Sequence, residues 1–298
     1  AVGGGSAVVS ARAASILLAE PGDLAGLCTS QADGGELRSP KLLAPKLPQL
    51  VVPTSPTTAT VKAGSAMIDP ASGRRLVLFD PKTRAHGVFL HPALVASSPL
   101  RVVISAGLNT LAMAVEGLLS PRGDPISDAL LMHAVRLLQR QLAALATGDD
   151  LETRADLMHA AILCGRGTDH TGAGLTIPLG HAVSSRRHVD NGIANAILLP
   201  HVVRFNAQAA PAGMRKVADV LAGGRSPAAP SSPEDAVCLE LERLFAALKV
   251  PRRLRDLGVA REALPDLAAV SMEDWFVRDN PRPVPDAATL LQVFEAAW

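Results

Sequence analysis

Between His181 and Ala207 the chain reads HAVSSRRHVDNGIANAILLPHVVRFNA, and no other segment carries as strong a fold signal. From Asn191 the residues are predominantly apolar and predict a helix that ends near Asn206. The basic residues in front of it, Arg186 and Arg187, are expected to lie in a loop together with His188. The segment therefore predicts a loop with basic residues followed by a helix.

Outward from this segment, the chain divides into a mixed first part and a helical second part. Short apolar runs predict strands at 50–53, 75–79 and 87–90, and 31–48 is expected to be a loop. Apolar residues at helical spacing, capping side chains and early prolines predict the helices. These are expected at 8–20, 128–145, 150–165 with Gly165 as C-cap, 191–206, 211–222, 233–248, 261–270 and 285–297, with a connection at 225–233.

Composition narrows the class of protein. The 298 residues are 48% hydrophobic and 19% charged, which is typical of a globular protein, and the net charge of +1 gives no electrostatic reason to expect nucleic acid or membrane as a partner. No apolar run reaches membrane-spanning length without a charge. Three cysteines without paired spacing (Cys28, Cys164 and Cys238) predict free thiols in a reducing, cytoplasmic environment.

Several short motifs, in order, resemble those of the iron-containing alcohol dehydrogenase family. They are GGGS at 3–6, Pro-Thr at 53–54, GLNTLAMAVEG at 107–117, the helix from Asn191 to Ala207, and NPRP at 280–283. The glycine turn alone is weak evidence, but the ordered set is specific. The resemblance implies a fold of α/β plus all-α class: a partial Rossmann-like domain (1–95, with the family's first strands and helices preceding Ala1) and an all-helical domain (96–298), as in dehydroquinate synthase-like proteins.

The resemblance also questions the family's chemistry. It implies metal ligands at the positions of Asn109, Met113, Ile177 and Asn191. Isoleucine has no donor atom, a thioether prefers softer metals, and neutral amides leave the charge of a cation uncompensated. We therefore expect neither iron nor zinc here, and we expect these four side chains to border the substrate. Asn109, within Gly-Leu-Asn, is similar to the maleylacetate reductase branch of the family.

For the cofactor, the resemblance implies NAD(P) on the glycine turn, because the N–H groups and positive dipole end of a helix N-terminus suit a pyrophosphate. A tight turn that only permits close packing is the alternative. The Gly and Glu residues that the family has after Pro-Thr are replaced, although hydroxyls remain, and a family lysine corresponds to an arginine. The candidate cofactor residues are Gly3, Gly4, Gly5, Ser6, Thr54, Thr57, Thr58 and Arg75.

His181 is the candidate proton donor, since it matches a family histidine that faces the active cleft and histidine titrates near neutral pH. A hydrogen-bonded core histidine is the alternative. Arg186 and Arg187 could hold a carboxylate or phosphate of the substrate, unless they are simply solvated. Asp169 and His170 are a less favoured pair for a proton relay.

Three functions stay open from the sequence. The first is a metal-independent NAD(P)-dependent reductase or dehydrogenase acting on a small substrate, for which an anionic group is one option. The second is a non-redox enzyme, such as a lyase, isomerase or cyclase, that uses the interdomain cleft. The third is a structural homologue without catalysis. A homodimer is possible in each case.

Overall fold

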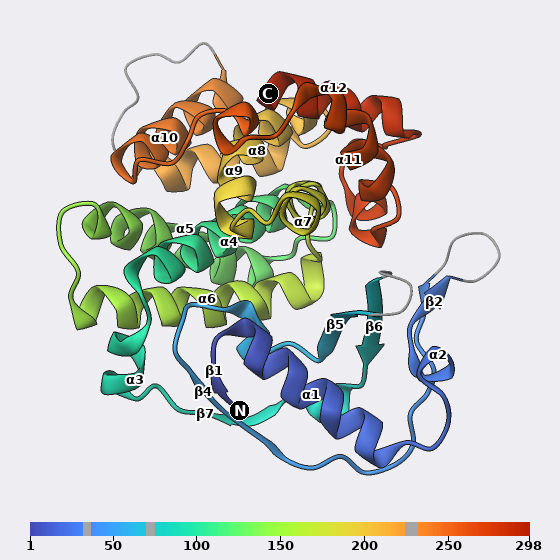
Figure 1. The fold of residues 1–298 in the computed structure, drawn as a ribbon. Coiled ribbons are helices and arrows are strands. Elements are labelled where there is room, and N and C mark those ends of the chain that lie inside the picture. Colours follow the sequence, from blue (N-terminus) through green and yellow to red (C-terminus); the bar gives the residue numbers. More distant parts are fainter. Residues whose placement is uncertain (32–36, 70–74, 224–231) are drawn as a thin grey trace.

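The computed structural model describes residues 1–31, 37–69, 75–223 and 232–298. The strands and α1 form one side of the molecule and the helices from α4 onward form the other (Figure 1). The strands are β1 (Val2–Gly3), β2 (Ser30–Gln31), β3 (Leu37–Arg38), β4 (Gln49–Pro53), β5 (Gly64–Ile68), β6 (Arg75–Phe79) and β7 (Ala85–Val88). The helices are α1 (Gly5–Ala19), α2 (Leu24–Leu27), α3 (Pro92–Ser97), α4 (Leu100–Leu119), α5 (Pro125–Leu145), α6 (Leu151–Thr171), α7 (Thr176–Arg187), α8 (Asn191–Asn206), α9 (Pro211–Ala222), α10 (Pro233–Ala247), α11 (Leu264–Ser271) and α12 (Ala287–Ala297).

A small parallel sheet positions the glycine turn. Its order is β1–β4–β7, with Gly3 opposite Pro53. Because parallel strands end at the same edge, the turn after β1 and the segment after β4 emerge side by side, at the kind of edge where α/β sheets bind ligands. After β4, the short 3₁₀ helix η1 (Thr58–Thr60) leads into the antiparallel β5–β6 hairpin.

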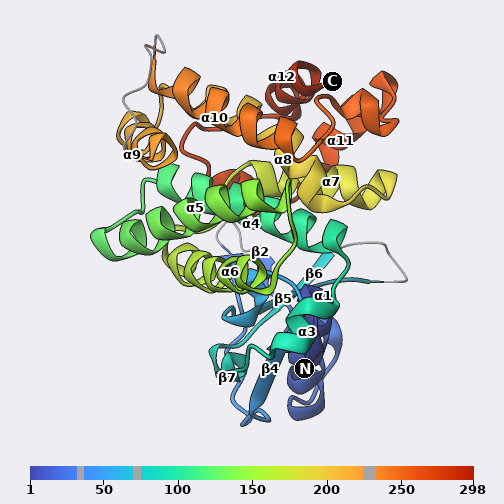
Figure 2. The same cartoon turned by 90° about the vertical axis from the view of Figure 1, so that its left-hand side faces the viewer.

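The helical part is built around α4, which packs against α5, α6, α7, α8 and α9 in layers that Figure 2 shows from the side. By length and apolar composition α4 could cross a membrane, but 67% of its most apolar window is buried inside the fold. Its residues belong to the large apolar core that joins α4 to α12. This helix is therefore the central core helix of the domain.

The expected fold class is confirmed, and several elements match their predicted bounds, including β6, α8 and α9. Three predictions of secondary structure are wrong. Residues 37–38, expected in a loop, form β3 and pair with β2. Helix α6 continues past Gly165 to Thr171 and is capped by Gly172 at φ 77°; Gly165 is needed for packing, since a Cβ there would lie 2.5 Å from Val61 Cγ2. Residues 186–187 are the end of α7 rather than a loop.

The remaining expectations concern the connections and the domain boundary. Helix α7 ends where His188 adopts a left-handed conformation at φ 54°. Most of the predicted connection at 225–233 lies outside the described residues, as does part of the predicted loop at 31–48. The boundary near residue 95 stays a prediction.

Candidate functional site

Three asparagines from α4 and α8 form a hydrogen-bonded cluster at the centre of the site. Asn109 Oδ1 accepts from Asn191 Nδ2 at 2.9 Å and from Asn195 Nδ2 at 2.7 Å. One turn along α4, Met113 Sδ lies 3.8 Å from Asn109 Nδ2. Spacing of four residues places Asn109 and Met113 on one face of α4, and Asn191 and Asn195 on one face of α8. We call the three asparagines the amide cluster.

Glycines bring the helices close enough for this cluster. A Cβ on Gly192 would lie 1.8 Å from the backbone oxygen of Ser105, so α8 contacts α4 directly. A Cβ on Gly180 would lie 1.7 Å from Asn195 Oδ1, so α7 also touches the amide cluster. Asn195 is fully buried, and Ile177, one turn before His181 on α7, is 4% exposed. Sequence reasoning missed Asn195, although its spacing from Asn191 could have indicated it.

These residues do not fit a catalytic iron or zinc ion. Asn109 Oδ1 is occupied by two N–H donors, and its amide nitrogen faces the Met113 sulfur. The buried Oδ1 atoms of Asn191 and Asn195 have no hydrogen-bond partner among the described residues, but both are neutral. Within the described ranges, no group of three or more His, Cys, Asp or Glu side chains could hold a metal. A catalytic zinc or iron site needs about three strong ligands, which this set lacks.

His181 is held by two charged side chains from distant parts of the chain. Its Nδ1 lies 2.9 Å from Arg75 Nη1, at the start of β6, and 3.3 Å from Asp274 Oδ2. Arg75 also pairs directly with Asp274. Arginine is always a donor, so in the neutral ring Nδ1 accepts from Arg75 and the proton is on Nε2. In the protonated ring, Nδ1–H can donate to Asp274 instead. Asp274 was not foreseen, because it is 93 residues away in sequence.

The charges of this triad favour a neutral imidazole and an ionised carboxylate. Burial lowers the pKa of His181, the hydrogen bond with Asp274 opposes that shift, and the charge of Arg75 adds to it. Burial alone would raise the pKa of Asp274, but the hydrogen bond with His181 and the charge of Arg75 lower it below its ordinary value. With 34% of its side chain exposed, His181 keeps access to solvent or ligand.

The glycine turn packs tightly against the segment after β4. A Cβ on Gly4 would lie 3.0 Å from Ser55 Oγ, and one on Gly5 would lie 2.9 Å from Thr57 Oγ1. Thr54 donates its N–H to the oxygen of Gly3 at 3.1 Å. The glycines are thus required by packing, while the turn still starts α1, whose first N–H groups suit an anion. A helix N-terminus after the turn is chemically suited to a dinucleotide phosphate, and binding of one by these residues stays a prediction.

The candidate cofactor and substrate residues meet at η1. The Thr58 hydroxyl lies 3.8 Å from Met113 Sδ, so the segment after β4 reaches the amide cluster. By contrast, Arg186 and Arg187 are exposed at the end of α7, and Arg186 Nε lies 3.6 Å from Asp266 Oδ2. The structure therefore does not place either arginine in contact with the amide cluster.

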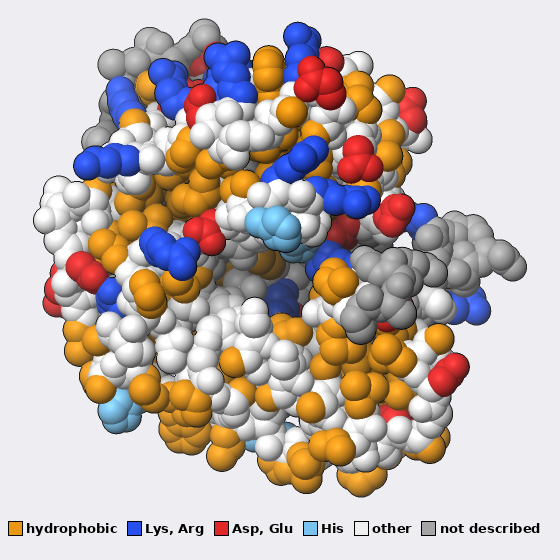
Figure 3. Space-filling view, in the orientation of Figure 1, with side chains coloured by type: hydrophobic (Ala, Val, Ile, Leu, Met, Phe, Trp, Pro, Cys, Tyr) orange, Lys and Arg blue, Asp and Glu red, His pale blue; other side chains and the backbone are white. Residues whose placement is uncertain are grey.

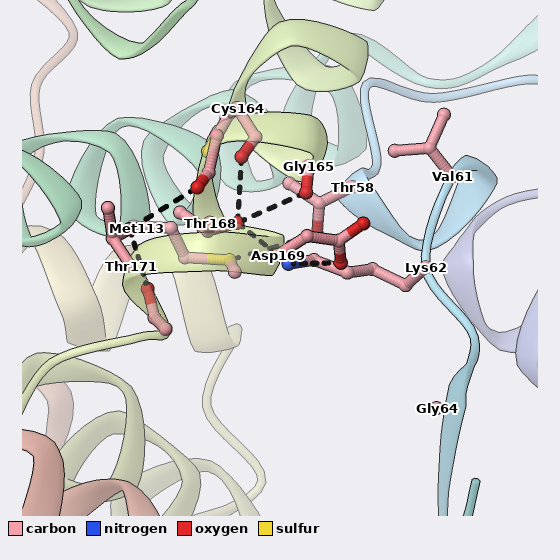
Figure 4. Close-up of polar contacts among 12 residues, drawn as sticks. Thr58, Val61, Lys62, Gly64, Met113, Cys164, Gly165, Thr168, Asp169 and Thr171 are labelled. Atoms are coloured by element: carbon pink, nitrogen blue, oxygen red, sulfur yellow. Dashed lines mark hydrogen bonds and ion pairs between the residues drawn. The ribbon is translucent and has the colours of Figure 1, made fainter. Parts of the chain in front are cut away.

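A charged group between η1 and α6 was also missed, because its members are about 20 to 100 residues apart. Lys62 Nζ lies 2.8 Å from Thr168 Oγ1 and 3.2 Å from Asp169 Oδ1, as Figure 4 shows. Arg84 binds the second oxygen of Asp169 at 2.6 Å. The proposed Asp169–His170 relay is wrong, since His170 instead lies 3.5 Å from Asp124.

The surface is hollowed where the two parts of the molecule meet. Figure 3 shows this hollow near the middle of the face, with a Lys or Arg side chain visible inside it and a histidine at its rim. At this junction Lys62 and Arg84 come from the strand side and Asp169 from α6 on the helical side, and their side chains are 22%, 34% and 25% exposed. These charged side chains are therefore partly accessible to solvent.

Comparison with known proteins defines the class of protein: this is an alcohol dehydrogenase-type fold. The profile described as Fe-containing alcohol dehydrogenase family, C-terminal, matches residues 103–298, and the chain belongs to this family. It is 30% identical to 1,3-propanediol dehydrogenase of Klebsiella pneumoniae over 192 residues, which are 64% of this chain and 50% of that protein. It is 29% identical to long-chain-alcohol dehydrogenase 1 of Geobacillus thermodenitrificans over all of this chain and 74% of the relative.

Solved structures agree with the family. A crystal structure of 1,3-propanediol oxidoreductase superposes with a TM-score of 0.89 at 26% identity, covering 100% of this chain and 76% of that one. Maleylacetate reductase of Agrobacterium tumefaciens superposes with a TM-score of 0.75 at 21% identity over 100% of this chain and 73% of the other, which shows a shared fold. An NAD-dependent methanol dehydrogenase of Bacillus methanolicus is 26% identical over 94% of this chain and 72% of that enzyme. The relatives are thus alcohol and aldehyde oxidoreductases, and the match with the first of them spans half its length.

Proposed function

We propose that this protein is an NAD(P)-dependent oxidoreductase that interconverts a small carbonyl compound and its alcohol without iron or zinc. The observation that carries the proposal is the amide cluster, in which Asn109 and Asn191 stand at two of the four positions where the family resemblance implies metal ligands. Asn109 Oδ1 is satisfied by two amide N–H groups, and the Oδ1 atoms of Asn191 and Asn195, which have no partner among the described residues, are neutral and do not compensate the charge of a cation. Family membership and the NAD-dependent relative support the redox chemistry.

The glycine turn and the hydroxyls of Thr54, Thr57 and Thr58 would hold the dinucleotide. A bound nicotinamide supplies or accepts the hydride. Because Thr58 contacts Met113, the substrate would lie between η1 and the amide cluster. Amide groups there can orient a carbonyl oxygen by hydrogen bonding, although they offer less charge stabilisation than a divalent cation.

His181 would supply the proton that the product alcohol needs. A proton taken up from solvent at Nδ1 would be held by Asp274, so that the resulting imidazolium would pass its Nε2 proton to the alkoxide and return to the neutral ring. The charge of Arg75 would disfavour a lasting imidazolium, and Asp274 would offset part of this effect. The triad thus orients His181 and keeps it neutral between turnovers. The buried free cysteines support a cytoplasmic location.

The test is NADH and NADPH binding by calorimetry, followed by cofactor oxidation with a panel of small aldehydes after chelator treatment and metal analysis. We expect micromolar binding of one cofactor and turnover that chelation leaves unchanged. Turnover that requires added Fe²⁺ or Zn²⁺ would contradict metal independence. Absence of cofactor binding would favour a non-redox enzyme or a structural homologue.

The role of His181 has its own measurement. His181→Asn is expected to lower kcat by about 10²-fold or more, since a positioned proton donor contributes that much, with cofactor affinity changed less than about threefold. His170→Asn, on the exposed surface beside Asp124, is the matched control and should leave kcat unchanged. Equal kcat values for both variants would remove His181 from the proton step.

A further inference from the structure

The Lys62 ammonium group is held in place by two neighbours, which leave one of its N–H donors without a partner among the described residues. Thr168 and Asp169 contact its ammonium group at 2.8 and 3.2 Å. The Thr168 hydroxyl donates in turn to the oxygen of Cys164 at 2.7 Å, so it accepts from Lys62. An ammonium has three N–H donors, and the third has no partner among the described residues. With its side chain 22% exposed, Lys62 is held at the junction rather than sealed inside it.

The surroundings of Lys62 carry excess positive charge. Asp169 is shared by Lys62 and by Arg84, which also donates to the oxygen of Val61 at 2.6 Å. Arg12, fully buried under the same segment, donates to the oxygens of Gly64 and Ala59 at 2.7 and 2.6 Å. Two cations therefore share one carboxylate, with the Arg12 charge beneath the same segment, and an additional anion would complete the balance.

The position of Lys62 connects it with the substrate side of the proposed site. It lies two residues after the end of η1, and η1 contacts Met113 of α4 through Thr58. Its anchor Thr168 lies on α6, one turn after Cys164, whose thiol is 3.5 Å from the oxygen of Thr110 on α4. Figure 4 shows Lys62, Thr168 and Met113 converging from these three elements.

We propose that Lys62 binds the anionic group of the substrate, so that the preferred substrates are small carbonyl compounds bearing a carboxylate, such as oxo acids with a terminal aldehyde. Here Asp169 and Thr168 are positioning residues: they hold the ammonium, and Asp169 competes with the substrate for it. The proposal rests on the proposed redox function for the carbonyl, but anion binding by itself needs no turnover. It assigns the anion site to Lys62 rather than to Arg186 and Arg187.

The test compares variants whose expected effects have opposite signs. Succinate binding to the intact protein is measured by calorimetry for wild type, Lys62→Met, Lys62→Arg and Asp169→Asn. Lys62→Met should weaken binding at least tenfold, and Lys62→Arg should retain part of it. Asp169→Asn should tighten binding about threefold or more, because it removes the competing carboxylate. Lys216→Met, which breaks the comparable 2.6 Å ion pair with Asp128 between α9 and α5, should change nothing.

Kinetics give a second, independent readout. With succinic semialdehyde as substrate, Lys62→Met should raise KM at least tenfold, while KM for the uncharged butanal should change less than twofold. Equal effects on both aldehydes, or weaker succinate binding in both Lys62→Met and Asp169→Asn, would overturn the proposal and assign the pair a purely structural role. Succinate binding that depends on Lys62 in a protein that binds no nicotinamide cofactor would keep this inference and remove the redox function.

Discussion

The two walls of the candidate site differ in the charge of their side chains. The helical wall, formed by α4, α7 and α8, is nearly free of charge at its centre and is closed by the amide cluster. The strand-side wall, formed by η1, β5 and the facing turn of α6, concentrates Arg12, Lys62, Arg84 and Asp169. The charged side chains of this site lie on the strand-side wall. The family resemblance instead implies a charged metal site between the helices.

Burial explains why the two walls differ. On the helical wall the closest approach of α7 and α8 leaves Asn195 fully buried, and an unpaired charge there would carry a large desolvation cost. On the strand side, Lys62 and Asp169 keep about a fifth to a quarter of their side chains exposed, so solvent and the opposite charge offset that cost. Even so, burial is the main effect on Lys62 and lowers its pKa, with Asp169 opposing the shift. The comparison predicts that the helical wall determines stability and the strand-side wall determines ligand charge.

The largest expected effect concerns Glu116, the carboxyl group that remains on α4. It is 3% exposed and accepts the N–H of Thr176, at the start of α7, at 2.8 Å. Burial raises its pKa to about 7, and the hydrogen bonds from Thr176 and Leu175 only partly oppose the shift. The folded state therefore binds this proton more tightly than the unfolded state, so stability is highest below the unfolded pKa and falls as pH rises towards 7.

Replacing this carboxyl should remove that pH dependence. Between pH 4.5 and pH 8, the free energy of unfolding of the wild type should fall by about 2 to 3 kcal/mol more than that of Glu116→Gln. This size follows from the shift of the Glu116 pKa from 4.5 to about 7. Urea unfolding across this pH range measures the slope. Glu152→Gln, at the exposed start of α6, should keep the wild-type slope. Parallel curves for all three proteins would show that Glu116 is ionised without penalty and that the helical wall tolerates charge.

The next effect tests the amide cluster itself. Asn109→Leu removes the oxygen that accepts from Asn191 and Asn195, and should destabilise the protein by about 1 to 2 kcal/mol because two buried donors lose their partner. Asn109→Asp keeps an acceptor for both donors, but it should be less stable at pH 7 than at pH 4, because its ionised carboxylate would have no cation beside it among the described residues. The urea midpoint at unchanged m-value measures both. If Asn109→Leu were as stable as the wild type, the hydrogen bonds of the amide cluster would not contribute to the stability of the protein.

The sequence predicted more of the helical wall than of the strand-side wall, and spacing explains why. Asn109, Met113 and Asn191 lie in the two most specific motifs, and i, i+4 periodicity is enough to place their side chains on shared helix faces. Lys62 meets Asp169 only because α6 continues past Gly165, whose missing Cβ lets η1 approach the helix. Asp274 reaches His181 from a short 3₁₀ helix (η5, Trp275–Asp279) that it caps. Contacts of this kind depend on tertiary packing and have no local pattern.

The smallest expected effect separates the two walls most sharply. Lys62→Met removes an ion pair whose partners are 22% and 25% exposed, and pairs of this kind contribute at most about 1 kcal/mol. The methionine keeps the packing of the aliphatic stem, so the midpoint of thermal unfolding should move by no more than a few degrees, as with Lys216→Met. Lys62→Met could instead destabilise the protein as much as Asn109→Leu does. The ion pair would then be a structural link between η1 and α6, and the strand-side wall would contribute to stability as the helical wall does. A small change in stability combined with a large loss of anion binding would place the function of Lys62 in ligand recognition, because folding would then depend little on the charge that the ligand needs.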